Sequence, residues 1–260
     1  RAEKRELNGL VSSGAVFELR DTVMADAQIL GQTRSLWLPL SGDVDLWIKA
    51  RPAGKSGEGM GGKLSANQRA RLERLQADDR IELRFNRTFF TSGDSREPEL
   101  AGIWGATKGS FFMLLVTLLL SFPLGVAAAI YLEEFARRSW WVDIVEVNIN
   151  NLAAVPSIVF GLLGLAVFIN FFGLPRSAPL VGGLVLTLMT LPVVIIASRA
   201  AIKAVPPSVR EAALGIGASQ MQMVFHHVLP LALPGMLTGA IIGMARALGE
   251  SAPLLMIGMV

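Results

Sequence analysis

Long apolar stretches without charged residues dominate the second half of the chain. The first, Gly109–Leu132, runs for 24 residues without a charge. As a helix rising 1.5 Å per residue it would be about 36 Å long, which exceeds the roughly 30 Å of hydrocarbon in a bilayer. Similar stretches follow, and another apolar run begins at Ser251. The pattern predicts membrane spans at about 109–132, 149–172, 178–200 and 230–249.

The first half of the chain has a different character. Residues 1–108 hold 17 Lys/Arg and 15 Asp/Glu, whereas the remainder holds only 7 and 6. A helix is predicted from Ser65 to about Gln76, and apolar side chains alternating with charged ones from Ile81 to Phe85 are typical of a strand. We therefore predict a small soluble α+β domain over residues 1–105, followed by an all-α polytopic membrane domain over residues 106–260.

Charges in the short connections predict the orientation of the spans. One side of the membrane carries five of these Lys/Arg residues, and the other carries only Arg176. Cytoplasmic connections are the ones enriched in Lys and Arg. We therefore expect residues 133–146 and 199–227 in the cytoplasm and residues 1–105 on the outer side. The five residues are Arg137, Arg138, Arg199, Lys203 and Arg210.

Composition excludes several classes of function. The chain has no cysteine, so disulfides and thiolate chemistry are excluded. Its two histidines, His226 and His227, are neighbours, which makes them poor joint metal ligands on a helix, and no His-Glu-x-x-His pattern occurs. We expect no metal, no cofactor and no enzymatic activity, and the absence of a basic patch with aromatics argues against nucleic acid. The chain starts without Met and stops inside an apolar run, so we interpret it as truncated at both ends.

The connection between the third and fourth predicted spans, residues 204–229, has a composition unlike that of a flexible linker. Ser208 followed three residues later by Glu211 is a capping-box signature, which predicts a short helix beginning there. Gly215 and Gly217 are expected to end that helix. A helix, a glycine bend and a second helix at a membrane surface indicate a segment that another protein binds. The local alternative is that Glu211 only caps its own helix.

This connection resembles the EAA loop of ABC-importer permeases, which docks on a cytoplasmic ATPase. The resemblance rests on Glu211-Ala212-Ala213, Gly217 and Leu229-Pro230, with His227 where the usual pattern has Ile. It implies that Glu211, Ala212, Ala213 and Gly217 form the ATPase-docking site. Ala212 and Ala213 carry no bulk, so a partner surface could approach the helix backbone closely.

Three further stretches resemble the PstA family of phosphate-specific transport permeases. They are residues 151–161 (NLAAVPSIVFG), 204–208 (AVPPS) and 247–255 (ALGESAPLL). This similarity covers about residues 100–260. Residues 1–99, especially 89–98 (FFTSGDSREP), resemble the extra N-terminal domain that some PstA proteins carry on the periplasmic side, for which the resemblance implies no defined role.

The resemblance implies the assembly and its location. The expected complex lies in the bacterial inner membrane and contains the sister permease PstC, two ATPase subunits and a periplasmic phosphate-binding protein. The family also implies six spans, and residues 1–105 would be periplasmic. ATP hydrolysis would belong to the partner, because this chain has no ATP-binding loop.

Three polar residues in the apolar segments are candidates for the substrate pathway. Arg246 and Glu250 are four residues apart, so on a helix they share a face and can pair. Charges within the bilayer cost about 2.5–3.5 kcal/mol on insertion scales and usually line a pathway. The alternative is that both lie at the outer interface. Ser157 follows Pro156 and could cap a half-helix that faces an anion, although a packing kink is the commoner explanation.

The sequence therefore supports one main hypothesis and leaves others open. The main one is a permease subunit that moves inorganic phosphate inward, driven by a partner ATPase. Within the same class the substrate could be another oxyanion, such as sulfate or molybdate. From other classes, the chain could be a membrane-anchored periplasmic receptor or scaffold, or an intramembrane hydrolase, which the missing metal motif disfavours.

Overall fold

The computed structural model describes residues 6–26, 29, 31–33, 35–50, 64–95 and 99–259. The chain divides into two compact units, residues 1–107 and 108–260. Within the expected N-terminal domain, residues 1–5, 27–28, 30, 34, 51–63 and 96–98 lie outside the described residues.

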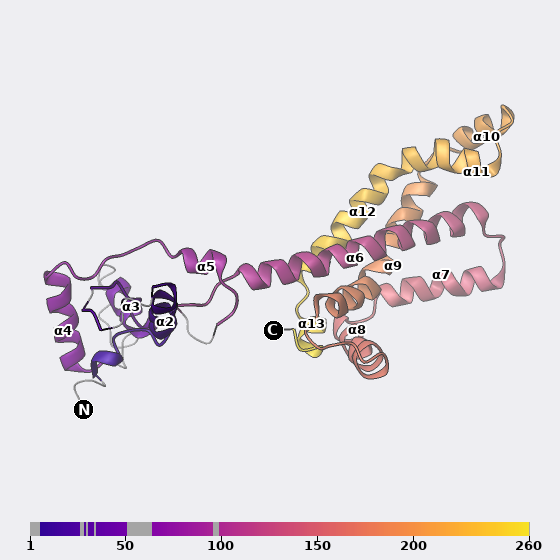
Figure 1. The fold of residues 1–260 in the computed structure, drawn as a ribbon. Helices are drawn as coiled ribbons and strands as arrows, with labels where there is room; N and C mark the ends of the chain where they lie inside the picture. The colour runs from indigo at the N-terminus through magenta and orange to yellow at the C-terminus, as the bar shows by residue number, and fades with distance from the viewer. Residues whose placement is uncertain are drawn as a thin grey trace. The chain divides into compact units, whose positions relative to one another are not determined.

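The N-terminal unit is built from short helices around a small apolar core (Figure 1). Its helices are α2 (Ala15–Ala25), α3 (Gly42–Ala50), α4 (Ala66–Ala77) and α5 (Arg87–Thr91). The predicted helix after Ser65 is confirmed: Ser65 and Gln68 form a reciprocal capping box at the start of α4. Its core consists of Leu10, Val44, Leu64 and Leu72.

The strand expected from Ile81 to Phe85 does not form, and these residues have no regular secondary structure. Within the described residues the only β pairing is an isolated bridge between Val11 and Leu40. Ile81 packs on the apolar core, whereas Leu83 and Phe85 are largely exposed. An alternating pattern becomes a strand only where another strand offers its backbone, and no described segment pairs with this one.

The second unit consists of helices, of which three stretches are long and apolar enough to cross a membrane: Trp104–Phe135, Pro179–Lys203 and Gln220–Gly249. An all-α polytopic fold is therefore confirmed for this unit. The elements are α6 (Trp104–Ile130) with a π-helical end η3 (Tyr131–Phe135), α7 (Trp140–Ala153), α8 (Ser157–Gly164) with η4 (Leu165–Phe171), α9 (Pro179–Lys203), α10 (Pro207–Gly215), α11 (Gln220–Met223) with η5 (Val224–Val228), α12 (Leu229–Gly249) and α13 (Ala252–Met256).

The stretch expected as a single span over 149–172 is broken. The chain bends by 101° between α7 and the α8–η4 segment. The break lies at Pro156, which lacks the N–H that would continue the helical ladder. Gly161 on α8 then packs directly on α13, since a Cβ there would come within 2.7 Å of the Pro253 Cα. Pro156 therefore marks a sharp turn between α7 and α8.

Helix α9 is the most buried of the three long stretches, and it packs against α12, α7 and α8. Small residues allow α9 and α12 to approach closely, as is common between helices in membranes. A Cβ added at Gly239 would lie 2.3 Å from the Cβ of Ala197. Thr117 on α6 donates a hydrogen bond to the Gly183 carbonyl on α9, at 3.2 Å.

Candidate functional site

The connection between α9 and α12 is a helical hairpin formed by α10 and α11. Pro207 occupies the first turn of α10 and Pro206 stands at its N-cap, with no side-chain cap. Proline at the first helical position has its φ already set for a helix, so α10 begins before Ser208. The capping box expected between Ser208 and Glu211 therefore does not form, and the exposed Glu211 carboxylate is not used as a cap.

Gly217 makes the bend between the two helices. Its φ of +92° lies in the left-handed region that favours glycine, and no atom lies within 4 Å of the position of an added Cβ. Backbone bonds close the end of α10: the Gly217 N–H donates to the Leu214 carbonyl and the Ala218 N–H to the Ala213 carbonyl. The predicted glycine bend is confirmed. A second capping pattern, Ser219-x-x-Gln222, starts α11, where both hydrogen bonds of a capping box are present.

The hairpin and the start of η5 expose several large apolar side chains. Ile216 is 81% exposed at the bend, and Met221 and Phe225 are about half exposed. Beside them on α10, Glu211 and Ala212 are exposed. This outer surface offers apolar contact and one carboxylate to a partner.

Ala213 differs from its neighbour. It is only 3% exposed and packs in a cluster that contains Met223 and Val224 of the second arm and Ile130 of α6. Adjacent residues on a helix point about 100° apart, so only one of the two alanines can face a partner. The expectation that both lie open to close approach is corrected: Ala212 does, and Ala213 holds the hairpin to its own chain.

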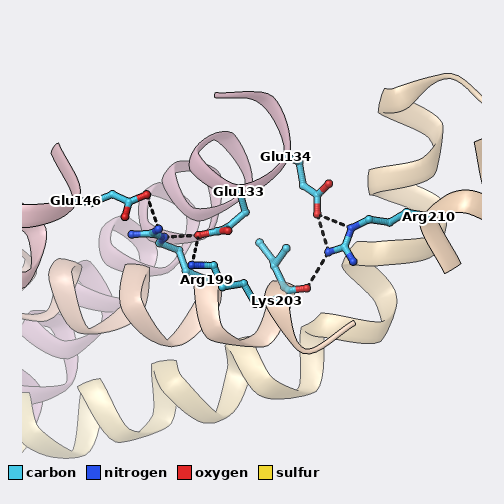
Figure 2. Close-up of polar contacts among 7 residues, drawn as sticks. Glu133, Glu134, Glu146, Arg199, Lys203 and Arg210 are labelled. Atoms are coloured by element: carbon cyan, nitrogen blue, oxygen red, sulfur yellow. Dashed lines mark hydrogen bonds and ion pairs between the residues drawn. The ribbon is translucent and has the colours of Figure 1, made fainter. Parts of the chain in front are cut away.

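Glu134 in η3 joins the hairpin to the end of α6 (Figure 2). Arg210 on α10 donates to Glu134 Oε1 from Nε at 3.1 Å and from Nη2 at 2.9 Å. The same guanidinium donates to the backbone carbonyls of Val205 and Ile202 at 2.7 and 2.9 Å. Gln220 on α11 donates from its amide to the backbone carbonyl of Glu134 at 2.6 Å. Both arms of the hairpin are therefore bonded to one residue.

A second ion-pair group lies beside the first and joins η3, α9 and α7. The Arg199 guanidinium on α9 lies between Glu133 of η3, at 2.5 Å, and Glu146 of α7, at 2.6 Å (Figure 2). The Arg199 and Glu133 side chains are only 11% and 13% exposed. Lys203 adds a peripheral contact to Glu133 at 3.3 Å and is itself largely exposed.

From the sequence, Arg199, Lys203 and Arg210 indicate only the orientation of the spans, and no partner is predicted for them. A signal was nevertheless present: Glu133 and Glu134 follow directly on a 24-residue apolar run, and Arg199 precedes a proline-rich turn at the end of another. Carboxylates and guanidinium groups at the ends of neighbouring spans tend to pair, because an unpaired buried charge is costly.

The three residues expected in the pathway lie at the other end of α12 and at the start of α8. Arg246 Nε lies 3.6 Å from Glu250 Oε1, so the expected pairing occurs; Arg246 is 44% exposed and Glu250 is 23% exposed. Ser157 is the first residue of α8, and in the described residues no hydrogen bond joins it to either charge. Ala247, next to Arg246, packs in one cluster with Phe160 of α8. The described residues contain no group of three or more His, Cys, Asp or Glu side chains placed to hold a metal.

Comparison with known proteins identifies the family. A family model described as the binding-protein-dependent transport system inner membrane component matches residues 121–259, which is more than half of the chain. The chain belongs to this family. Its members are membrane components of transport systems, not enzymes. Residues 1–57 match a second model, a domain of unknown function named DUF3333.

Individual relatives agree with this assignment. The chain is 36% identical over 168 residues to the probable ABC transporter permease protein YqgI of Bacillus subtilis, and 34% identical over 154 residues to the phosphate transport system permease protein PstA of Yersinia pestis. These matches cover 64% and 59% of this chain but 56% and 52% of the relatives, so the chain spans about half their length. In a solved structure of the MetNI methionine ABC transporter, one chain matches with a TM-score of 0.50 at 22% identity, over 58% of this chain and 73% of that one, which supports the fold.

Proposed function

We propose that this chain is the permease subunit of an ATP-driven importer for inorganic phosphate. The observation that carries the proposal is the exposed α10–Gly217–α11 hairpin in a chain of the inner membrane component family. Several relatives that match over more than half of this chain are named phosphate transport system permease protein PstA. The substrate assignment rests on these names, and the transport class rests on the family.

The hairpin is the proposed docking site for the ATPase. Large apolar side chains on a surface such as that of Ile216 mark a place where a partner excludes water. Glu211 and Ala212 would lie in that contact, and Gly217 would keep the bend that presents them. Ala213 contributes from beneath, by holding α10 against the buried cluster.

Arg246, Glu250 and Ser157 are the proposed pathway residues. A partly exposed arginine near the end of an apolar helix is costly against lipid, so it is expected to face a polar cavity or a neighbouring subunit. Glu250 would orient the guanidinium, leaving donors for an anion. Ser157 and the first N–H groups of α8 would offer further donors, as helix N-termini do for phosphate.

The proposed assembly follows the family. It contains a sister permease of the PstC type, two ATPase subunits and a periplasmic phosphate-binding protein. The proposed location is the bacterial inner membrane, with α10 and α11 on the cytoplasmic side and residues 1–105 in the periplasm. The enriched Lys and Arg of the 133–146 and 199–227 connections support this orientation.

The experiment uses the full-length complex in proteoliposomes, with the binding protein and radiolabelled phosphate outside and ATP inside. We expect ATP-dependent phosphate uptake that excess unlabelled phosphate blocks and that sulfate or molybdate leaves unchanged. Block by sulfate or molybdate alone would assign another oxyanion. Phosphate uptake that is the same with and without ATP would overturn the assignment as an ATP-driven transporter. A receptor or scaffold would then be the better interpretation.

A further inference from the structure

Three hydrogen bonds accepted by Glu134 hold both arms of the hairpin to the end of α6. Its carboxylate accepts from Arg210 on α10 and its backbone carbonyl accepts from Gln220 on α11. The Glu134 side chain is 7% exposed and that of Arg210 is 22% exposed. The pair is thus enclosed within the chain, and it does not lie on the outer surface of the hairpin.

Arg210 connects a third element as well. Its Nη2 also donates to the carbonyl of Ile202 in the last turn of α9, and its Nη1 donates to the carbonyl of Val205, just after that helix ends. Three helix ends therefore meet at one guanidinium: α6 through Glu134, α9 through its last carbonyls, and α10 through the chain. Only arginine has a planar fork of donors that can satisfy this set, because a lysine ammonium is a single point charge.

We propose that Glu134 and Arg210 are positioning residues that fasten the docking hairpin to the end of α6, so that both move as one body during transport. The proposal deepens the proposed function and rests on it. It assigns α6 as an element that receives the motion of the ATPase directly, although Glu134 and Arg210 lie 76 residues apart in the chain.

Apolar packing alone would give a weaker linkage. The cluster beneath the hairpin includes Ala129 and Ile130 of α6 beside Ala213 and Val224. Apolar contacts are non-directional, so such surfaces can slide over one another. The fork of Arg210 on Glu134 is directional and charge-assisted, which fixes the position of one element on the other.

The test exploits the absence of cysteine in the chain. The double variant Glu134→Cys/Arg210→Cys is assembled into the complete complex, whose partner subunits have been freed of accessible cysteine. A flexible bis-thiosulfonate linker then joins the two positions, and a reductant releases it. A linker is needed because paired Arg and Glu side chains hold their Cα atoms further apart than a disulfide allows. Phosphate uptake and ATP hydrolysis are measured together, and their ratio is the readout.

We expect the ratio of phosphate uptake to ATP hydrolysis to fall at least fivefold in the unlinked double variant. It should return to within twofold of the wild-type ratio when the linker is in place, and fall again when the linker is reduced. A purely structural role would change the amount of complex but not this ratio. Wild-type coupling in the unlinked variant would overturn the proposal, and so would a linked complex that is inactive, since the hairpin would then have to separate from α6.

Two further variants keep the test decisive. If the cysteine pair fails to assemble, Arg210→Lys is used instead, because it keeps the positive charge and removes the forked guanidinium donors. We expect its ratio of phosphate uptake to ATP hydrolysis to be at least threefold below that of the wild type. An unchanged ratio contradicts the proposal. Lys203→Gln is the matched control, because Lys203 makes only a peripheral contact and is 61% exposed; its ratio should equal wild type. Failure of the wild-type complex to import phosphate would overturn the proposed function instead, so the two failures are distinguishable.

Discussion

Arg199 on α9 and Glu146 on α7 meet at 2.6 Å, and Glu133 takes the other side of the same guanidinium. This group joins η3 at the end of α6, the last turns of α9 and the middle of α7. Because Arg199 is nearly buried, removing one of its two carboxylate partners takes away a charge-assisted hydrogen bond in a poorly solvated place.

We therefore predict that Glu133→Gln destabilises the assembled protein by about 1.5–3 kcal/mol, the range for a hydrogen bond to a charged group, because Arg199 keeps its contact with Glu146. Thermal unfolding of the complex in detergent measures the change as a fall in Tm. Lys203→Gln is the control, since exposed pairs contribute only about 0–1 kcal/mol. Equal Tm values for the two variants would show that the Arg199 group does not hold these helix ends.

The contact between α9 and α12 makes a second prediction. Gly239→Ala would place its Cβ 2.3 Å from that of Ala197, so the helices must separate. Overpacking of this kind costs roughly 1–3 kcal/mol. The double variant Ala197→Gly/Gly239→Ala should recover most of the lost Tm, because the same volume is only moved across the interface. Gly109→Ala, where nothing lies within 4 Å, is the neutral control. No recovery in the double variant would contradict direct packing at this point.

The bend at Gly217 makes a third prediction. Gly217→Ala has space for its methyl group but must hold a φ of +92°, at a cost of about 1–2 kcal/mol. We expect reduced co-purification of the ATPase and reduced phosphate uptake, with normal insertion in the membrane. Gly215→Ala, with open space and no positive φ, should behave as wild type. Similar losses in both variants would mean that the glycine conformation is not what presents the docking surface.

The proposed pathway makes a fourth prediction. Arg246→Ala should abolish phosphate uptake while the ATPase still assembles, because the variant removes the anion's partner and leaves the hairpin intact. Glu250→Gln should weaken uptake less, since it only frees the guanidinium from a contact of 3.6 Å. Uptake and ATPase co-purification are measured on the same preparations. Normal uptake by Arg246→Ala would remove this residue from the pathway.

The sequence predicts the long helices, the break at Pro156 and the bend at Gly217, because each depends on local chemistry: apolar length, a missing N–H and a glycine-only φ. It does not predict that Arg210 finds Glu134, which lies 76 residues earlier. Apolar periodicity says which residues form helices, but the rotation of each helix about its axis decides which charges meet.

Contacts between distant parts of the chain also decide which of the two alanines is buried and why the strand expected from Ile81 to Phe85 does not form. Ala212 and Ala213 are identical in composition, and only the packing of α10 on its cluster determines which one is buried. The alternation from Ile81 to Phe85 is a local signal, whereas a strand requires a partner from elsewhere in the chain. Helix capping also depends on the neighbouring residues. Because α10 begins at Pro207, Ser208 lies inside the helix, and the capping box expected between Ser208 and Glu211 does not form.

The most direct test of the account is cross-linking from the bend of the hairpin. Ile216 is suited to this test because it is 81% exposed in the isolated chain. It is replaced by a photoreactive amino acid in the full-length complex, and the cross-linked adducts are identified by mass spectrometry. The account predicts an adduct with the nucleotide-binding subunit whose yield changes when ATP is trapped. Adducts with periplasmic proteins only, or no adduct with an ATPase, would contradict it.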